Sequence, residues 1–232
     1  MNRLVRRLAQ LAFLTMILAI AAGTASAQST GTVTINGSVA KSASIRWWSF
    51  TALNTETGAN APNTQNSPLL FTLSVGDVSP ANSNNYAGGK VKVVLRTNAA
   101  YALSAQVTAS SGFGAASGDL TLSDVGFGLA NLANSGGLVS GDPATTSVIA
   151  GSFGNDPSAA AKNADGVPTF ATSLNNVSSS ATQVLSGPRI SKGGSVSSPN
   201  NGLLVDTIYA IGPQYFTPTT FSATVTYTIT TP

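Results

Sequence analysis

The chain of 232 residues contains no cysteine and no histidine. Without cysteine it can form no disulfide, so a hydrophobic core must stabilise any folded domain by itself. The two absences also remove the side chains that serve most often as general bases, thiol nucleophiles and zinc ligands. Charged residues make up only 8% of the chain. Because exposed helices are usually rich in lysine and glutamate, this scarcity favours strands and turns over surface helices.

Carboxylates are few and scattered. The acidic residues are one glutamate, Glu56, and seven aspartates. The nearest pair, Asp119 and Asp124, is five residues apart and would lie on opposite faces of a straight strand. It therefore does not form the facing pair of carboxylates that glycoside hydrolysis needs. We expect no enzyme activity, no metal site and no cofactor.

The first 27 residues have the three-part pattern of a secretory signal. A basic segment at 3–7 precedes an apolar run at 11–22, and small residues follow at 25–27. The apolar run has 12 residues, whereas a helix needs about 20 to cross a membrane. We therefore expect residues 1–27 to be cleaved, with no membrane insertion afterwards. The mature protein would pass through a periplasm and then be extracellular or at the cell surface.

The charge of the remaining chain is balanced. The net charge of the whole chain is +3, but three of its 11 basic residues belong to the signal, which leaves 8 basic against 8 acidic residues. The one basic cluster is Lys90, Lys92 and Arg96, whose even spacing places them on one face of a strand. A solvated face explains such a cluster, and a basic patch for nucleic acid is absent.

Apolar residues alternate with small polar ones along much of the chain, which predicts half-buried strands. The clearest case is 221–230, where every second residue is apolar and its neighbours are serine or threonine. Further strands are expected at 69–75, 91–95, 101–107, 147–153, 183–190 and 203–211, with a weaker one at Leu120 and Leu122. The loop at 96–100 is short enough for a hairpin. Asp156 and Pro157 would begin the one short helix.

These elements predict an all-β fold, namely an antiparallel β-sandwich of about eight to ten strands. A single closed sheet is the alternative. The region 112–166 is rich in Gly, Ala, Ser and Asn and is expected to be a long, loop-rich insertion. We divide the chain into a signal at 1–27, an N-terminal strand or donor arm at 28–41, and a β-sandwich domain at 42–232.

The only tryptophans, Trp47 and Trp48, lie next to each other in an expected strand. Strict alternation places Ile45 and Trp47 on one face and Trp48 and Phe50 on the other. If one face is core, the other exposes a tryptophan and a phenylalanine, as in a surface for carbohydrate or for a protein partner. The alternative is a strand that is buried on both faces.

The segment after the signal also alternates. Val33, Ile35, Gly37 and Val39 share one face of an expected strand. Such an arm could add to the edge of another subunit through its backbone hydrogen bonds. Alternatively, Asn36-Gly37 forms a hairpin turn, or the segment is the first strand of its own domain.

Two segments resemble bacterial pilins assembled by the chaperone–usher route, specifically the cysteine-free class of fimbrial major subunits. One is the alternating arm, Thr32 to Val39, and the other is the terminal segment YFTPTTFSATVTYTI, Tyr215 to Ile229. The resemblance implies an incomplete immunoglobulin-like sandwich, completed by a neighbour's arm, and a fibre built head to tail. The chain is longer than a typical pilin of that class, and 112–166 has no counterpart.

We therefore expect a secreted, non-catalytic structural or adhesive surface subunit that associates with itself or with another surface subunit. The alternative is a soluble carbohydrate-binding module or adhesin tip that uses an exposed tryptophan.

Overall fold

The computed structural model describes residues 34–53, 58–60, 72–75, 78, 80, 86–135, 143–191 and 202–232. The chain divides into two units, Met1–Val39 and Ala40–Pro232. The described part of the first unit, residues 34–39, belongs to no helix or strand, and its side chains are exposed. All described strands belong to the second unit.

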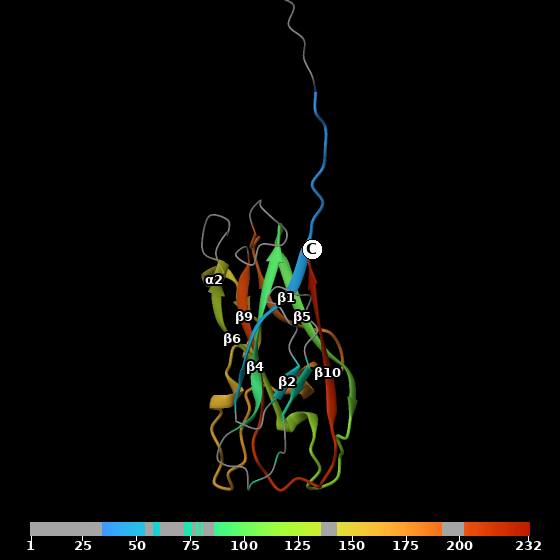
Figure 1. The fold of residues 1–232 in the computed structure, drawn as a ribbon, viewed down its shortest axis with the longest axis vertical. Coiled ribbons are helices and arrows are strands. Elements are labelled where there is room, and N and C mark those ends of the chain that lie inside the picture. The colour runs from blue at the N-terminus through green and yellow to red at the C-terminus, as the bar shows by residue number, and fades with distance from the viewer. Residues whose placement is uncertain are drawn as a thin grey trace, which may run out of the picture. The chain divides into compact units, whose positions relative to one another are not determined.

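Two four-stranded antiparallel sheets form the second unit (Figure 1). Sheet I has the order β1 (Ala43–Ala52), β4 (Ala87–Thr97), β9 (Leu203–Ile211) and β6 (Val125–Asn134). Sheet II has the order β10 (Ser222–Thr230), β5 (Tyr101–Ser111), β8 (Thr182–Gly187) and β7 (Val148–Ile149). A separate two-stranded ribbon pairs β2 (Gly58–Asn60) with β3 (Thr72–Ser74). The all-β sandwich expected from the alternating sequence is therefore confirmed.

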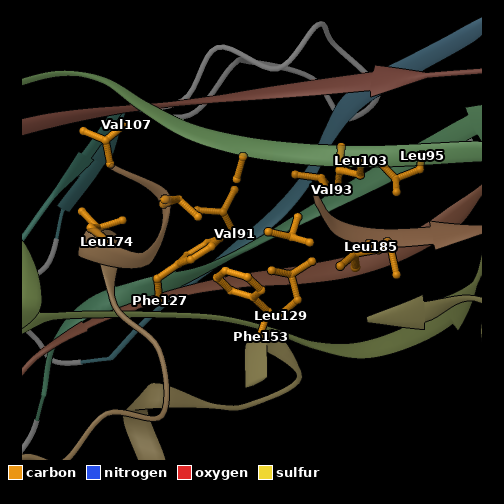
Figure 2. Close-up of a cluster of buried hydrophobic side chains, with 14 of the residues drawn as sticks. Val91, Val93, Leu95, Leu103, Val107, Phe127, Leu129, Phe153, Leu174 and Leu185 are labelled. Carbon is orange, nitrogen blue, oxygen red and sulfur yellow. The ribbon is translucent and has the colours of Figure 1, made fainter. Parts of the chain in front are cut away.

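The core fills the space between the two sheets. Figure 2 shows side chains from β4, β5 and β6 meeting there, with Phe153, Leu174 and Leu185 among them. The largest fully buried side chains are Phe127, Leu95, Leu103, Leu120, Leu129, Leu185, Ile190, Leu203, Ile208, Ile211, Val93 and Val94. At about 1.5–3 kcal/mol for each buried aliphatic or aromatic side chain, such a core can stabilise a domain that has no disulfide.

The connection after β4 is not the expected hairpin. β4 pairs with β1 and β9, whereas β5 pairs with β10 and β8. The Thr97 hydroxyl donates to the carbonyl oxygen of Ala99 and accepts from its amide, which turns the chain out of sheet I. The Thr97 carbonyl oxygen accepts from the amides of Ile190 and Ser191, at 3.2 and 2.8 Å. The bend is therefore held by the segment after β8, and the chain crosses to the other sheet.

Helices are short within the described residues. They are η2 (Leu122–Asp124), α2 (Pro143–Thr146), η3 (Gly151–Phe153), η4 (Pro157–Ala159) and η5 (Leu174–Val177), of which only α2 is α-helical. None of them has the length or the apolar character needed to cross a membrane. The helix expected after Asp156 is confirmed as η4. The weak strand expected at Leu120 and Leu122 is wrong, because Thr121 and Asp124 form a capping box that begins η2 there.

The region 112–166, expected to be a loop-rich insertion, contains the ten-residue strand β6. Its core-facing residues, Val125, Phe127 and Leu129, alternate with Gly126 and Gly128. A side chain at Gly126 would meet the Phe170 ring at 2.4 Å. The glycines therefore let the segment 150–172 pack closely on the outer face of sheet I.

An ion pair ties that segment to the sheet. Lys90 Nζ on β4 lies 2.5 Å from Asp156 Oδ2, and the other carboxylate oxygen caps η4 by accepting from the Ser158 amide. Burial opposes ionisation of Asp156, but the bonds from Lys90 and Ser158 outweigh it and lower the pKa. On the same sheet face, Lys92 Nζ lies 3.6 Å from Asp206 Oδ1.

Candidate functional site: the open edge of the sandwich

One side of the sandwich is bounded by β1 and β10, which we call the open edge. Each is the outermost strand of its sheet and pairs on one side only among the described residues. The two strands approach each other across the sandwich. An outermost strand presents unpaired backbone N–H and C=O groups, to which another chain can add.

The core is incompletely covered along this edge. Ile45, Trp47 and Phe50 of β1 and Val225, Tyr227 and Ile229 of β10 all pack against the core but stay partly exposed. The core-facing residues of the inner strands are buried: Val93 on β4 is 2% exposed and Leu103 on β5 is 1% exposed. A further strand beside β1 or β10 would therefore remove apolar surface from water.

The two tryptophans do not divide as strict alternation predicts. Trp47 pairs opposite Val93, and Ser49 opposite Lys92, so Trp48 is an extra residue in a β-bulge. The bulge shifts the alternation by one residue, and Phe50, opposite Val91, faces the core together with Trp47. The predicted pairing of Trp48 with Phe50 on one face is wrong. Of Trp47, Trp48 and Phe50, which the sequence offered as candidates for a ligand or partner surface, Trp48 alone lies outside the core contacts.

The indole N–H of Trp47 is buried at this edge. Its nitrogen, Nε1, has no hydrogen-bond partner among the described residues. A buried donor without a partner costs about 1–3 kcal/mol, because its bond to water is lost and not replaced. Trp47 therefore contributes apolar packing at the open edge, while no group in the described parts of the chain bonds to its Nε1.

β10 is the less protected of the two outer strands. β1 contains the bulge at Trp48 and the charged residue Arg46, both of which hinder the addition of a further strand. β10 contains no charged residue and no proline. Its register shift against β5 leaves the extra residue, Thr108, on β5, so β10 itself is uninterrupted. β10 is therefore the more favourable strand for pairing with another chain.

Two tyrosines join the sheets near this edge. Tyr209 on β9 and Tyr227 on β10 bring their hydroxyl oxygens to 2.6 Å, within hydrogen-bond distance. Burial raises the pKa of Tyr209, and burial together with Tyr209 raises the pKa of Tyr227 well above its usual value. Both phenols therefore stay neutral near pH 7 and act as hydrogen-bonding groups. Sequence alternation places each tyrosine on a core face but gives no sign that they meet.

The proposed arm residues form no strand within the described part of the chain. Ile35 and Val39 are each 92% exposed. Neither Asn36 nor Gly37 has the positive φ that a type I′ hairpin turn requires, so the Asn-Gly turn is not formed. Val33 lies outside the described residues.

The aspartates act mainly in turns and caps. Asp119 accepts from the Ala116 amide, Asp124 from Thr121, and Asp156 from Ser158. Within the parts of the chain that the structure describes, no three acidic residues gather as a metal site would require. The Lys90 and Lys92 side chains of the basic cluster each pair with an aspartate.

Comparison with known proteins provides no relative for this chain. No protein-family model, no curated protein and no solved structure matches it. The open edge, the arm and the distribution of charge are therefore the guides to its function.

Proposed function

We propose that this protein is a secreted, non-catalytic structural or adhesive subunit. In this proposal, the arm of one copy, residues 28–41, adds as a strand to β10 of the next copy and builds a fibre. The proposal rests on the properties of β10. This outer strand is uncharged and uninterrupted, and its core-facing side chains remain partly exposed. Soluble proteins usually protect such an edge with charge, proline or a bulge.

The arm carries apolar side chains that could cover the partly exposed core at this edge. Val33, Ile35 and Val39 supply an apolar face, and Ile35 and Val39 are each 92% exposed. Burying an aliphatic side chain of this size contributes about 1.5–3 kcal/mol. The backbone of the arm would pair with β10, as in other cases of strand addition.

The dimensions agree. As a strand, residues 33–39 would extend over about 23 Å at about 3.3 Å per residue, and the nine residues of β10 extend over about 30 Å. The glycine at position 37 leaves room for a large neighbour such as Tyr227, while Ile35 and Val39 would lie beside Val225 and Ile229 in either direction of pairing. Completion of the sandwich by a neighbour is also what the resemblance to fimbrial subunits implies.

The test compares the molar mass in solution of two purified forms, residues 28–232 and residues 42–232. We expect ladders or polymers from the longer form. The shorter form should stay monomeric, because it keeps every described strand of the sandwich but lacks the arm that would be donated. Monomers of equal stability from both forms would refute strand donation.

Point variants test whether polymerisation depends on the apolar face of the arm and not merely on the presence of the arm. Ile35→Arg places a charge on the face that would pack against β10, and polymerisation should be lost. Ser38→Arg places the same charge on the opposite face of the same arm and should leave polymerisation unchanged. Equal loss in both variants would show that the arm does not bind in strand register.

A second candidate function is carbohydrate binding at Trp48. The observation in its favour is that Trp48 is held by a bulge on an outer strand and is partly exposed without packing on the core. Soluble polysaccharides should then change the tryptophan fluorescence of the parent but not of Trp48→Phe. An unchanged spectrum of the parent across polysaccharides would count against this function.

A further inference from the structure

The arginines are gathered at one end of the sandwich. We call the end where β1 begins and β4 ends the proximal end; the C-terminus of the chain lies there (Figure 1). Arg46 and Arg96 lie within the four residue pairs of β1 and β4 nearest to Thr97; Arg46 is partly exposed, and Arg96 is buried, with 8% exposure. Arg189 follows β8, where the next two amides bond to the Thr97 carbonyl oxygen. These are all the arginines that follow the expected signal.

The opposite, distal end carries acidic residues. Asp119 and Asp124 lie between the end of β5 and the start of β6, and Asp165 lies in the loop that packs near Gly212, just after β9. Asp165 is exposed, and Asp119 and Asp124 are partly exposed. One cation is also present, Lys162, which lies 5.2 Å from the centre of the Tyr86 ring.

The charges between the two ends are paired. Lys90 pairs with Asp156 and Lys92 with Asp206, so the middle of sheet I adds no net charge. Lys41, at the proximal end, contacts the Pro232 carbonyl oxygen. The other charged residues of the expected mature chain, Glu56, Asp77, Asp142 and Lys192, lie outside the described residues. Among the described residues the sandwich is therefore positive proximally and negative distally.

We propose that the proximal end of one copy docks on the distal end of the next copy, with the exposed Arg189 meeting aspartates. This docking rests on the proposed fibre and adds to it the order in which subunits meet. Arginine suits the role, because its planar guanidinium can bind a carboxylate through two hydrogen bonds. A contact between two different surfaces does not close into a symmetric dimer and so continues into a chain.

The charge separation also complements strand donation. The arm joins the sandwich at Ala43, the start of β1, and therefore leaves from the proximal, positive end. Attraction to the negative end of another copy would bring the arm towards β10, which begins distally at Ser222 opposite Ser111. Long-range attraction chiefly raises the rate of encounter and disfavours the wrong orientation.

The test uses residues 28–232 and exposed positions only. Arg189→Glu and Asp165→Lys each place like charges at the proposed contact, and each should slow polymer growth about tenfold at low salt. The two changes combined in one chain restore opposite charges and should restore the rate. Arg189→Lys loses the bond from Arg189 Nε to the Ser191 carbonyl oxygen but keeps the charge. It should behave as the parent.

Salt provides an independent measurement. Between about 0.01 M and about 1 M salt the screening length falls from about 30 Å to about 3 Å. Polymer growth of the parent should slow over this range. The difference in growth rate between the parent and the single variants should disappear at high salt.

The outcomes distinguish the two proposals. Polymers that grow equally fast in all variants would overturn end-to-end docking and leave strand donation intact. A parent that never polymerises, yet associates reversibly at low salt and loses this in Arg189→Glu, would support docking and refute strand donation. A parent that stays monomeric at every salt concentration would overturn both.

Discussion

The hydroxyl oxygens of Tyr209 and Tyr227 lie 2.6 Å apart, with Tyr209 reaching from sheet I and Tyr227 from sheet II. The contact is a polar bridge through an apolar interior, where Phe127 packs 5.7 Å from Tyr209 and 6.5 Å from Tyr227, between ring centres. Buried hydrogen bonds of this kind fix one arrangement of the two sheets, because each hydroxyl left alone loses its bond to water. Since Tyr227 belongs to β10, the bridge also holds the outer strand in place.

The tyrosine bridge can be measured by a double-mutant cycle. Tyr209→Phe and Tyr227→Phe should each lower the free energy of unfolding by about 1 kcal/mol, and the double variant should lose less than the sum, because each single change leaves a hydroxyl without its partner. Urea unfolding measures all three. Tyr215→Phe, at a side chain that is 92% exposed, is the control and should leave stability unchanged. Strict additivity would show that the two hydroxyls do not interact.

Alkaline pH should unfold the protein. Burial raises the pKa of Tyr101 to about 12, and the pKa values of Tyr209 and Tyr227 are raised as well, against 10.0 in an unfolded chain. Above pH 10 the unfolded chain has lost tyrosine protons that the folded protein retains, so the free energy of unfolding decreases as pH rises. The contribution is complete below about pH 10 and is lost by about pH 12 for Tyr101.

Urea titrations at a series of pH values would measure this loss. Tyr101→Phe should flatten the decline, since one of the raised groups is removed, although it also loses a 3.0 Å bond to the Ser147 hydroxyl. A free energy of unfolding that stays constant from pH 9 to pH 12 would contradict the burial of these phenols.

Gly126 should not tolerate alanine. A Cβ there would lie 2.4 Å from the Phe170 ring and 2.7 Å from Pro157, so the segment 150–172 must move away. Forced overpacking of this kind costs about 1–3 kcal/mol. Urea unfolding and limited proteolysis of 150–172 would detect it. Gly154→Ala is the matched control, because its nearest contact would be 3.7 Å, and it should be tolerated.

Trp47 and Trp48 should differ in their effect on stability. Trp47→Ala should lower the free energy of unfolding by about 3 kcal/mol, because it removes a partly buried indole that packs on the core. Trp48→Ala removes the bulge residue that lies outside those contacts and should cost clearly less. Thermal or urea unfolding of the two variants would measure these losses. Equal losses would show that the bulge does not separate the two side chains.

Alternation predicted much of the fold. Strands at 203–211 and 221–230 correspond to β9 and β10 almost residue for residue. β10 alternates regularly along its length, whereas β9 is an inner strand that is buried on both faces. β6 was missed because glycines stood where polar residues were expected. The missing information was the segment 150–172, which covers those glycines and is distant in sequence.

The candidate site was only partly predictable. Exposed apolar residues in the arm follow from composition and spacing alone. A bulge, in contrast, depends on how β1 pairs with β4, so the faces of Trp48 and Phe50 could not be assigned from β1 by itself. The same limit applies to Tyr209 and Tyr227, whose contact depends on how the two sheets pack. Charge segregation likewise appears only when the turns are placed at the ends of the sandwich.

The crossing of the chain between sheets after β4 has a consequence for how the protein is made. Sheet I receives its inner strand β9 only at residues 203–211, and β5 receives β10 only at residues 222–230. A chain that emerges from its N-terminus therefore cannot complete either sheet until nearly all of it has appeared. Pairings so distant in sequence also form slowly. β1 and β4 can pair once residue 97 has appeared, but the other alternating strands remain available to wrong partners until β9 and β10 arrive, so the sandwich is completed late.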